Sequence, residues 1–352
     1  MCLEATTMAA SSMKMKKSSS LITKSSTQFL LSAPNSKTGK FELMDYDSLP
    51  EFLKHNEFIV SYYRSEWPLK QTILSIFSIH NETLNIWTHL IGFFIFLMLT
   101  GYAASVFPTV SNAYPLLQLS TAGNSTNTFY IDRAQQTLME PSASFSSELV
   151  GSVIPRWPFY LYLAGAMFCL LMSSACHLLS CHCYRTSYIM LRLDFAGISG
   201  LIVSSFYPLV YYTFTCNPFF RDLYLASITF FGLATVIVSL TQVFDSPQFR
   251  PVRAVLFACM AASGVVPIAH KMMTFGHRPE AVLTTGYEAV MGMFYVVGVV
   301  VYVARVPERW LPGKFDLAGH SHQLFHVLVV AGAYTQYLGS LVYLGWRENE
   351  GC

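Results

Sequence analysis

The chain has 352 residues, of which 53% are hydrophobic and only 12% are charged, and its formal net charge is +2. Soluble domains carry roughly 25% charged residues, so this composition excludes an ordinary soluble fold and indicates a multi-spanning membrane protein. The small net charge gives no sign of a nucleic-acid partner. The eight cysteines are not spaced like a secreted disulfide scaffold.

The N-terminal part of the chain changes character at residue 41. Residues 1–40 are rich in Ser, Thr and Lys, with Glu4 as the only acid, which predicts a disordered cytosolic tail. A transit peptide has a similar composition and is the alternative. Residues 41–82 mix charged and apolar side chains. Within them, four apolar residues at helical spacing predict a short amphipathic helix on the membrane surface: Leu69, Ile73, Leu74 and Phe77.

Seven long apolar stretches follow, and we predict a membrane helix in each. At about 1.5 Å per residue, each can cross about 30 Å of hydrocarbon. The fifth is interrupted by Gly264 and Pro267. The predicted spans are 83–107, 157–181, 189–214, 222–244, 254–274, 283–305 and 321–346. The predicted fold class is therefore an all-α membrane protein. Its seven-helix bundle occupies residues 83–346, with a long outer loop at 108–156 and an outer C-terminal tail at 347–352.

The positive charges predict how the bundle is oriented. With the N-terminus in the cytosol, 16 of the 22 Lys and Arg residues lie on the cytosolic side and six on the other, mostly because of the N-terminal tail. The triplet that starts at Asn124 is a glycosylation acceptor, which functions only on the outer or lumenal side. We therefore expect a cytosolic N-terminus and an outer C-terminus, in the plasma membrane or an endomembrane.

Polar residues gather where three of the predicted spans meet the cytosolic face. The second span ends near His177, the third begins near Asp194, and the seventh begins with His322 and His326, which share one helix face. Three imidazoles would leave the fourth tetrahedral position of a zinc ion open for water, as in catalytic sites. Asp194 would orient that water or accept its proton. Ser173, one turn before His177, would hydrogen-bond a substrate carbonyl.

Several alternatives to a metal site stay open at this point. A histidine near a helix end is often only interfacial, and a pair four residues apart arises by chance fairly often. Cys181 and Cys183 are other possible ligands, although packing or palmitoylation suits them better. His182 and His320 fit the solvent boundary. Glu288, inside the sixth span, needs a polar partner that the sequence does not identify.

At these residues the chain resembles the progestin and adiponectin receptor family. The resemblance covers about residues 66–346 and rests on four blocks in the same order: His80 to Gly92, Ser173 to His177, Asp194, and Ser321 to Val330. Residues 41–50 look like the plant members, the heptahelical transmembrane proteins. Departures lie only in the loop 108–156, which is longer than usual, and in the tail 1–40.

The resemblance implies a site and a set of activities. Family members are seven-helix proteins with a cytosolic N-terminus, in which three histidines hold zinc and an aspartate contacts its water. By position these are His177, His322, His326 and Asp194, with Ser173 beside them. Adiponectin receptors hydrolyse ceramides, and plant members are linked to hormone, osmotic and sugar responses.

Two functions of different classes follow from these features. The first is a zinc-dependent hydrolase of a membrane lipid amide, such as ceramide, which the open coordination position and Asp194 favour. The second is a signalling receptor with a structural zinc and a hormone or protein ligand on its outer side. The lack of an extra acid for the amine leaving group favours the receptor. A transporter is the weakest reading, because Glu288 is the only ionisable candidate near the midplane.

Overall fold

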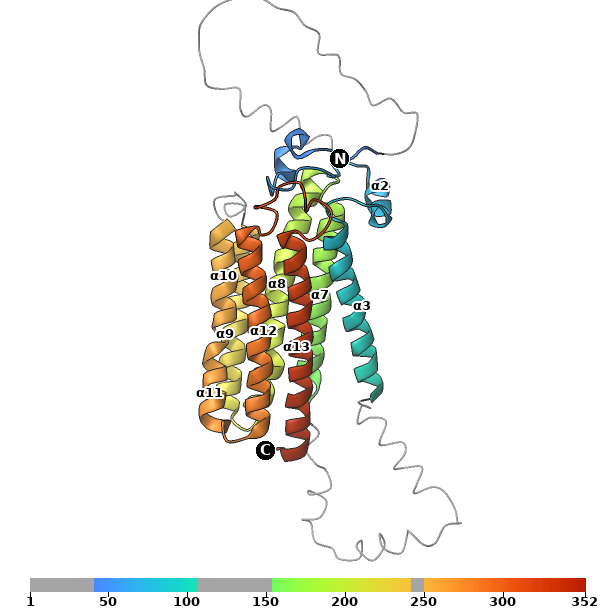
Figure 1. The fold of residues 1–352 in the computed structure, drawn as a ribbon. Coiled ribbons are helices and arrows are strands. Elements are labelled where there is room, and N and C mark those ends of the chain that lie inside the picture. Colours follow the sequence, from blue (N-terminus) through green and yellow to red (C-terminus); the bar gives the residue numbers. More distant parts are fainter. Residues whose placement is uncertain (1–40, 107–153, 242–249) are drawn as a thin grey trace, which may run out of the picture.

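The computed structural model describes residues 41–106, 154–241 and 250–352 (Figure 1). Within these ranges, seven helical spans are long and apolar enough to cross a membrane, so the predicted all-α bundle is confirmed. The predicted tail 1–40, most of the loop 108–156 and the acceptor Asn124 lie outside the described residues. The helices are α3 (Thr83–Val106), α7 (Trp157–Leu179), α8 (Tyr184–Thr213), α9 (Pro218–Leu240), α10 (Arg250–Ala262), α11 (Val265–Phe275), α12 (Pro279–Ala304) and α13 (Ser321–Glu350).

Several helices begin earlier than their apolar stretches predicted. Helix α8 begins at Tyr184 instead of residue 189, and α9 and α12 begin at Pro218 and Pro279 instead of residues 222 and 283. Proline suits the first helical turn, because its fixed φ is helical and its missing N–H needs no partner there. Hydropathy locates only the part of a helix that lies in hydrocarbon, so it misses the polar turns beyond.

The fifth span is built from two helices. Helix α10 ends at Ala262 and α11 begins at Val265, and together they supply the span Val255–Phe275. Pro267 lies in the first turn of α11, where a helix tolerates the missing N–H. The interruption that the sequence predicted at Gly264 and Pro267 is therefore a local break within one crossing.

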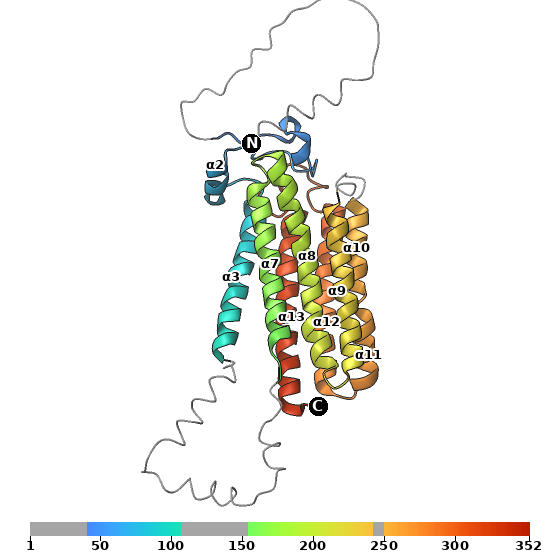
Figure 2. The same ribbon diagram turned by 180° about the vertical axis from the view of Figure 1, so that it is seen from behind.

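Helix α13 runs through the middle of the bundle. It packs against α12 on one side and against α3, α7 and α8 on the others (Figures 1 and 2). Helices α7 and α8 approach closely at two glycines. A Cβ atom at Gly165 would lie 2.0 Å from Ser204 Oγ, and one at Gly197 would lie 3.0 Å from the Cα atom of Cys169. Small residues allow such close contact between membrane helices. This contact fixes the register of α7 on α8.

Residues 41–82 and 305–320 lie over one end of the bundle, which we call the covered end (Figure 1). A small apolar core holds the first segment together: Leu49, Leu53, Ile59 and Tyr63. The Asp316 carboxylate joins the two segments, because it accepts hydrogen bonds from the backbone N–H groups of Val60 (3.0 Å) and Ser61 (2.9 Å). Residues 41–82 are therefore docked on the bundle.

A short helix within this segment lies outside the bundle, beside the start of α3 (Figure 1). Helix α2 (Leu69–Leu74) is followed by the 3-10 turn η3 (Ser75–Phe77). Thr72 is buried, whereas Leu74 is exposed and Phe77 is 81% exposed. The apolar side of this element thus faces away from the protein. Its predicted place on a membrane surface stays a prediction.

Glu288 has its polar partner on α11. The Lys271 ammonium lies 2.9 Å and 2.8 Å from the two Glu288 carboxylate oxygens, and both side chains are buried. Lys271 also donates to Tyr343 Oη at 2.7 Å and to Thr284 Oγ1 at 3.1 Å. The sequence-based count placed Lys271 among the outer charges, and that placement is wrong. Lys271 is internal because a buried carboxylate on α12 balances its charge.

The end of α13 also differs from the prediction of a tail at 347–352, because the helix continues to Glu350. Arg347 is 4% exposed, and its guanidinium donates to the backbone carbonyls of Tyr212 and Thr213 at the end of α8. A disulfide joins Cys216 to Cys352. These contacts hold the last turn of α13 in place at the end of the bundle opposite the covered end.

Candidate metal centre

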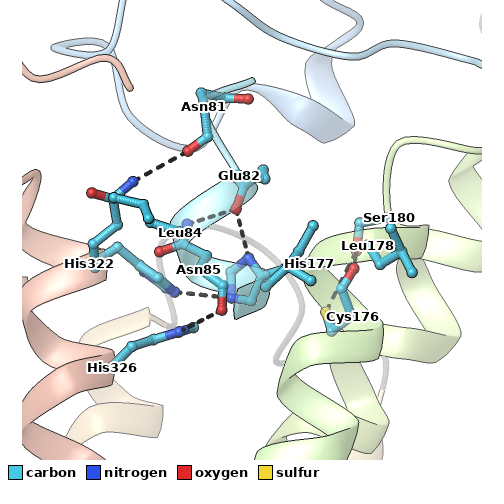
Figure 3. Close-up of polar contacts among 12 residues, drawn as sticks. Asn81, Glu82, Leu84, Asn85, Cys176, His177, Leu178, Ser180, His322 and His326 are labelled. Carbon is cyan, nitrogen blue, oxygen red and sulfur yellow. Dashed lines mark hydrogen bonds and ion pairs between the residues drawn. The ribbon is translucent and has the colours of Figure 1, made fainter. Parts of the chain in front are cut away.

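Three histidines meet at the covered end of the bundle. His177 lies in the last turn of α7, and His322 and His326 lie in the first two turns of α13. One ligand atom from each falls within 4.8 Å of the others. The Nε2 atoms of His177 and His322 are 3.1 Å apart (Figure 3). Because α7 ends and α13 begins at this level, the opposite directions of the two helices bring together residues far apart in the chain.

The other ring nitrogens of two of these histidines are already engaged. His177 Nδ1 donates to Glu82 Oε2 at 2.7 Å, and His326 Nδ1 donates to the backbone carbonyl of Asn85 at 3.1 Å (Figure 3). A proton on Nδ1 leaves the Nε2 lone pair free to bind a metal. The Nε2 atoms of His177 and His322 lie 3.1 Å apart, close enough for both to bind one cation. The donor set therefore fits a metal ion, and three imidazoles are a ligand set that zinc uses.

Glu82 is the residue that the sequence reasoning missed. It stands immediately before α3, and its Oε2 also accepts a hydrogen bond from Asn85 Nδ2 at 2.6 Å. Burial raises the pKa of Glu82, but its interaction with the His177 ring and the hydrogen bond from Asn85 outweigh burial and hold that pKa well below its usual range. Glu82 is thus a carboxylate that orients a candidate ligand. An acid directly before the first span, at the depth of the histidines, was the available signal.

Ser173 and Asp194 lie next to the three histidines. Ser173 is buried one turn before His177 on α7, and its hydroxyl lies near the Asp194 carboxylate on α8. Asp194 lies near His177, although it is not one of the three residues whose ligand atoms group together. The structure thus brings all five predicted site residues to one place. The individual roles of Asp194 and Ser173 stay predictions.

Comparison with known families now places the chain. The model of the family described as haemolysin-III related matches residues 77–337. The chain belongs to this family. The chain is 52% identical to heptahelical transmembrane protein 4 of Arabidopsis thaliana, over 89% of this chain and 91% of that protein. It is 48% identical to heptahelical transmembrane protein ADIPOR3 of rice, over 89% of this chain and 93% of that one.

A more distant relative comes from an animal. The chain is 33% identical to the adiponectin receptor protein of Drosophila melanogaster, over 85% of this chain and 59% of that protein. These matches confirm the resemblance to the progestin and adiponectin receptor family, with plant proteins at the highest identities. Together with the seven apolar spans, they identify an adiponectin-receptor-like integral membrane protein with several spans.

Other polar residues lie around the three histidines but are not part of the candidate ligand group. The prediction that His320 lies at the solvent boundary is wrong, because His320 is buried and its ring contacts the backbone carbonyl of Asn81 at 3.4 Å. The docked segment 41–82 covers it. His182 contacts the backbone carbonyl of Trp67 at 2.8 Å. Cys181 is buried beside Thr72, which agrees with a packing role.

His89 stacks on the ring of one candidate ligand, His326, and fixes the plane of that ring. It is buried on α3, and its ring stacks on that of His326, with ring centroids 3.7 Å apart and an interplanar angle of 4°. Helix α3 therefore holds His326 from two sides, by this stack and by the Asn85 carbonyl. The motif that runs from His80 to Gly92 thus supplies the surroundings of the candidate metal centre.

Proposed function

We propose that this protein is a zinc-dependent hydrolase of membrane lipid amides, such as ceramides, with its metal centre near the cytosolic face. The observation that carries the proposal is the arrangement of the three histidines. His177 and His326 have their Nδ1 atoms engaged, and the Nε2 atoms of His177 and His322 face each other. Such a set supplies three ligands and leaves room for a fourth, which is typical of catalytic zinc.

The residues around the ligands suit the hydrolysis of an amide. A zinc ion bound there would supply a Lewis acid that makes a water nucleophile available near neutral pH. Asp194 would accept the proton from that water as its oxygen adds to the amide carbon. The C–N bond would then break, and Asp194 would return the proton to the nitrogen of the leaving amine. Ser173, whose hydroxyl lies near that carboxylate, would hydrogen-bond Asp194 and hold it in position.

A signalling receptor with a structural zinc is the second candidate. The three ligands come from α7 and α13, and two of them are held by Glu82 and Asn85 at the start of α3. Zinc at this place would fix how these helices pack and so hold one conformation. A hormone or protein ligand on the outer side would then act on that conformation in hormone or stress signalling.

The hydrolase proposal predicts that a single carboxylate controls the rate. Asp194→Ala should lower the release of fatty acid from ceramides by about 10²–10⁴-fold while zinc content stays unchanged, because only the proton carrier is lost. Purified protein would be loaded with zinc, and both quantities would be measured together. Asp222→Ala, at an exposed aspartate near the start of α9, is the matched control. Release at no more than the protein-free background by both the parent and Asp194→Ala would exclude hydrolysis here and favour the receptor.

We also propose that the covered end faces the cytosol, which places the C-terminus outside. The support is the excess of Lys and Arg in and before the segment 41–82. Asn124→Gln should then abolish a glycan-dependent shift in gel mobility when the protein is inserted into glycosylation-competent membranes. A glycan attached instead at an acceptor site engineered next to Lys54, within residues 41–82, would contradict this orientation.

A further inference from the structure

Arg64 connects the docked segment 41–82 to the helix end that carries His177. Its guanidinium donates from Nη2 to the His177 carbonyl at 2.8 Å and from Nη1 to the Leu178 carbonyl at 3.1 Å. Nη1 also donates to Ser75 Oγ at 2.5 Å. Arg64 is only 3% exposed. Both carbonyls belong to the last turn of α7, where a helix has no N–H groups of its own left to satisfy them.

A buried arginine at this place fixes the position of the helix end. The C-terminus of a helix carries a partial negative charge, which a cation stabilises. Burying the guanidinium costs free energy unless its N–H groups are bonded, so Arg64 and the end of α7 depend on each other. The planar guanidinium reaches two neighbouring carbonyls at once, which the single ammonium of a lysine cannot do with the same geometry.

We propose that Arg64 is a positioning residue for the metal centre and that it makes residues 41–82 part of that site. The inference rests on the proposed metal binding. Arg64 holds the main chain of His177, while Glu82, from the same segment, holds its ring. A shift of the segment would therefore move His177 away from His322. Metal affinity thus depends on how residues 41–82 are docked, and a partner that displaces them would weaken binding.

The experiment compares two buried arginines that cap helix ends. Arg347 bonds two neighbouring carbonyls at the end of α8, as Arg64 does at the end of α7. It lies 21 residues beyond His326 along α13, which is about 30 Å. Arg64→Met, Arg64→Lys and Arg347→Met would be made in the full-length chain. The affinity for Zn²⁺ would be measured by competition with a chelator on the folded, monodisperse fraction, alongside the melting temperature.

We expect Arg64→Met to weaken zinc binding by about 10–100-fold, the usual effect of losing a residue that positions a ligand. Arg64→Lys should weaken zinc binding less, since the positive charge at the helix end remains. Arg347→Met should lower the melting temperature and leave zinc affinity as in the parent. If Arg64→Met does not fold, Ser75→Ala should still weaken zinc binding, because it removes the hydroxyl that anchors Arg64 Nη1 together with the bond of that hydroxyl to the Thr72 carbonyl.

Two results would overturn the inference. One is a zinc affinity equal to that of the parent in Ser75→Ala and in those Arg64 variants that fold. The other is an equal loss in Arg347→Met, which would mean that general destabilisation is the cause. A parent protein that binds no zinc would instead refute the proposed function, so the two failures are distinguishable.

Discussion

Replacing Lys271 by methionine should lower the free energy of unfolding by about 3–5 kcal/mol, the largest effect on stability that we expect from one substitution. The reason is that Glu288 would be left as an uncompensated charge in the bundle. Its carboxylate is bonded by Lys271 through both oxygens and by the Tyr343 hydroxyl at 2.5 Å. After the substitution only the Tyr343 hydroxyl would remain. The measurement is the equilibrium unfolding of the detergent-solubilised protein.

A double substitution distinguishes the effect of breaking the Lys271–Glu288 ion pair from the effect of losing side-chain packing. In Lys271→Met with Glu288→Gln, no charge is left buried, so most of the lost stability should return. Arg278→Gln is the matched control, because Arg278 forms an ion pair with Glu350 in which both side chains are substantially exposed. Exposed pairs contribute about 0–1 kcal/mol, so this variant should stay close to the parent. A loss below about 1 kcal/mol in Lys271→Met would contradict our account of the pair.

Replacing His322 by alanine should abolish the zinc binding that we propose. Two remaining imidazoles cannot hold zinc as three do, so zinc content should fall from about one ion per chain to near zero. His326→Ala and His177→Ala should behave alike. Glu82→Gln should keep the metal but bind it about 10–100-fold more weakly, because a neutral amide orients the His177 ring less firmly. Zinc would be measured by elemental analysis of the purified protein and affinity by competition with a chelator.

An exposed histidine supplies the control for this series. His277 precedes α12 at the end of the bundle opposite the covered end, and His277→Ala should keep the zinc content of the parent. Full zinc in His322→Ala would show that our ligand set is wrong. If Glu82→Gln bound zinc as tightly as the parent, the hydrogen bond between Glu82 and His177 would not support metal binding.

The sequence by itself determined the class of fold and the three histidines. Apolar stretches identify spans because a membrane helix must be long and hydrophobic, and this holds without knowledge of its neighbours. The sequence predicted that the histidines lie close together, because helix direction alone places the end of α7 and the start of α13 at one level. Spacing on one helix then puts His322 and His326 on the same face. These properties depend only on local periodicity and on the order in which the helices cross the membrane.

The tertiary structure alone decided which polar groups pair. Glu82 meets His177 from 95 residues away, Arg64 reaches the His177 carbonyl, and Lys271 reaches Glu288 from another helix. Such pairs depend on how each helix is rotated and on how deep its side chains lie, and hydropathy fixes neither. In a bundle with few charges, each charge must nonetheless find a partner. The sequence therefore showed that partners were needed, and only the packing of the helices showed which residues they are.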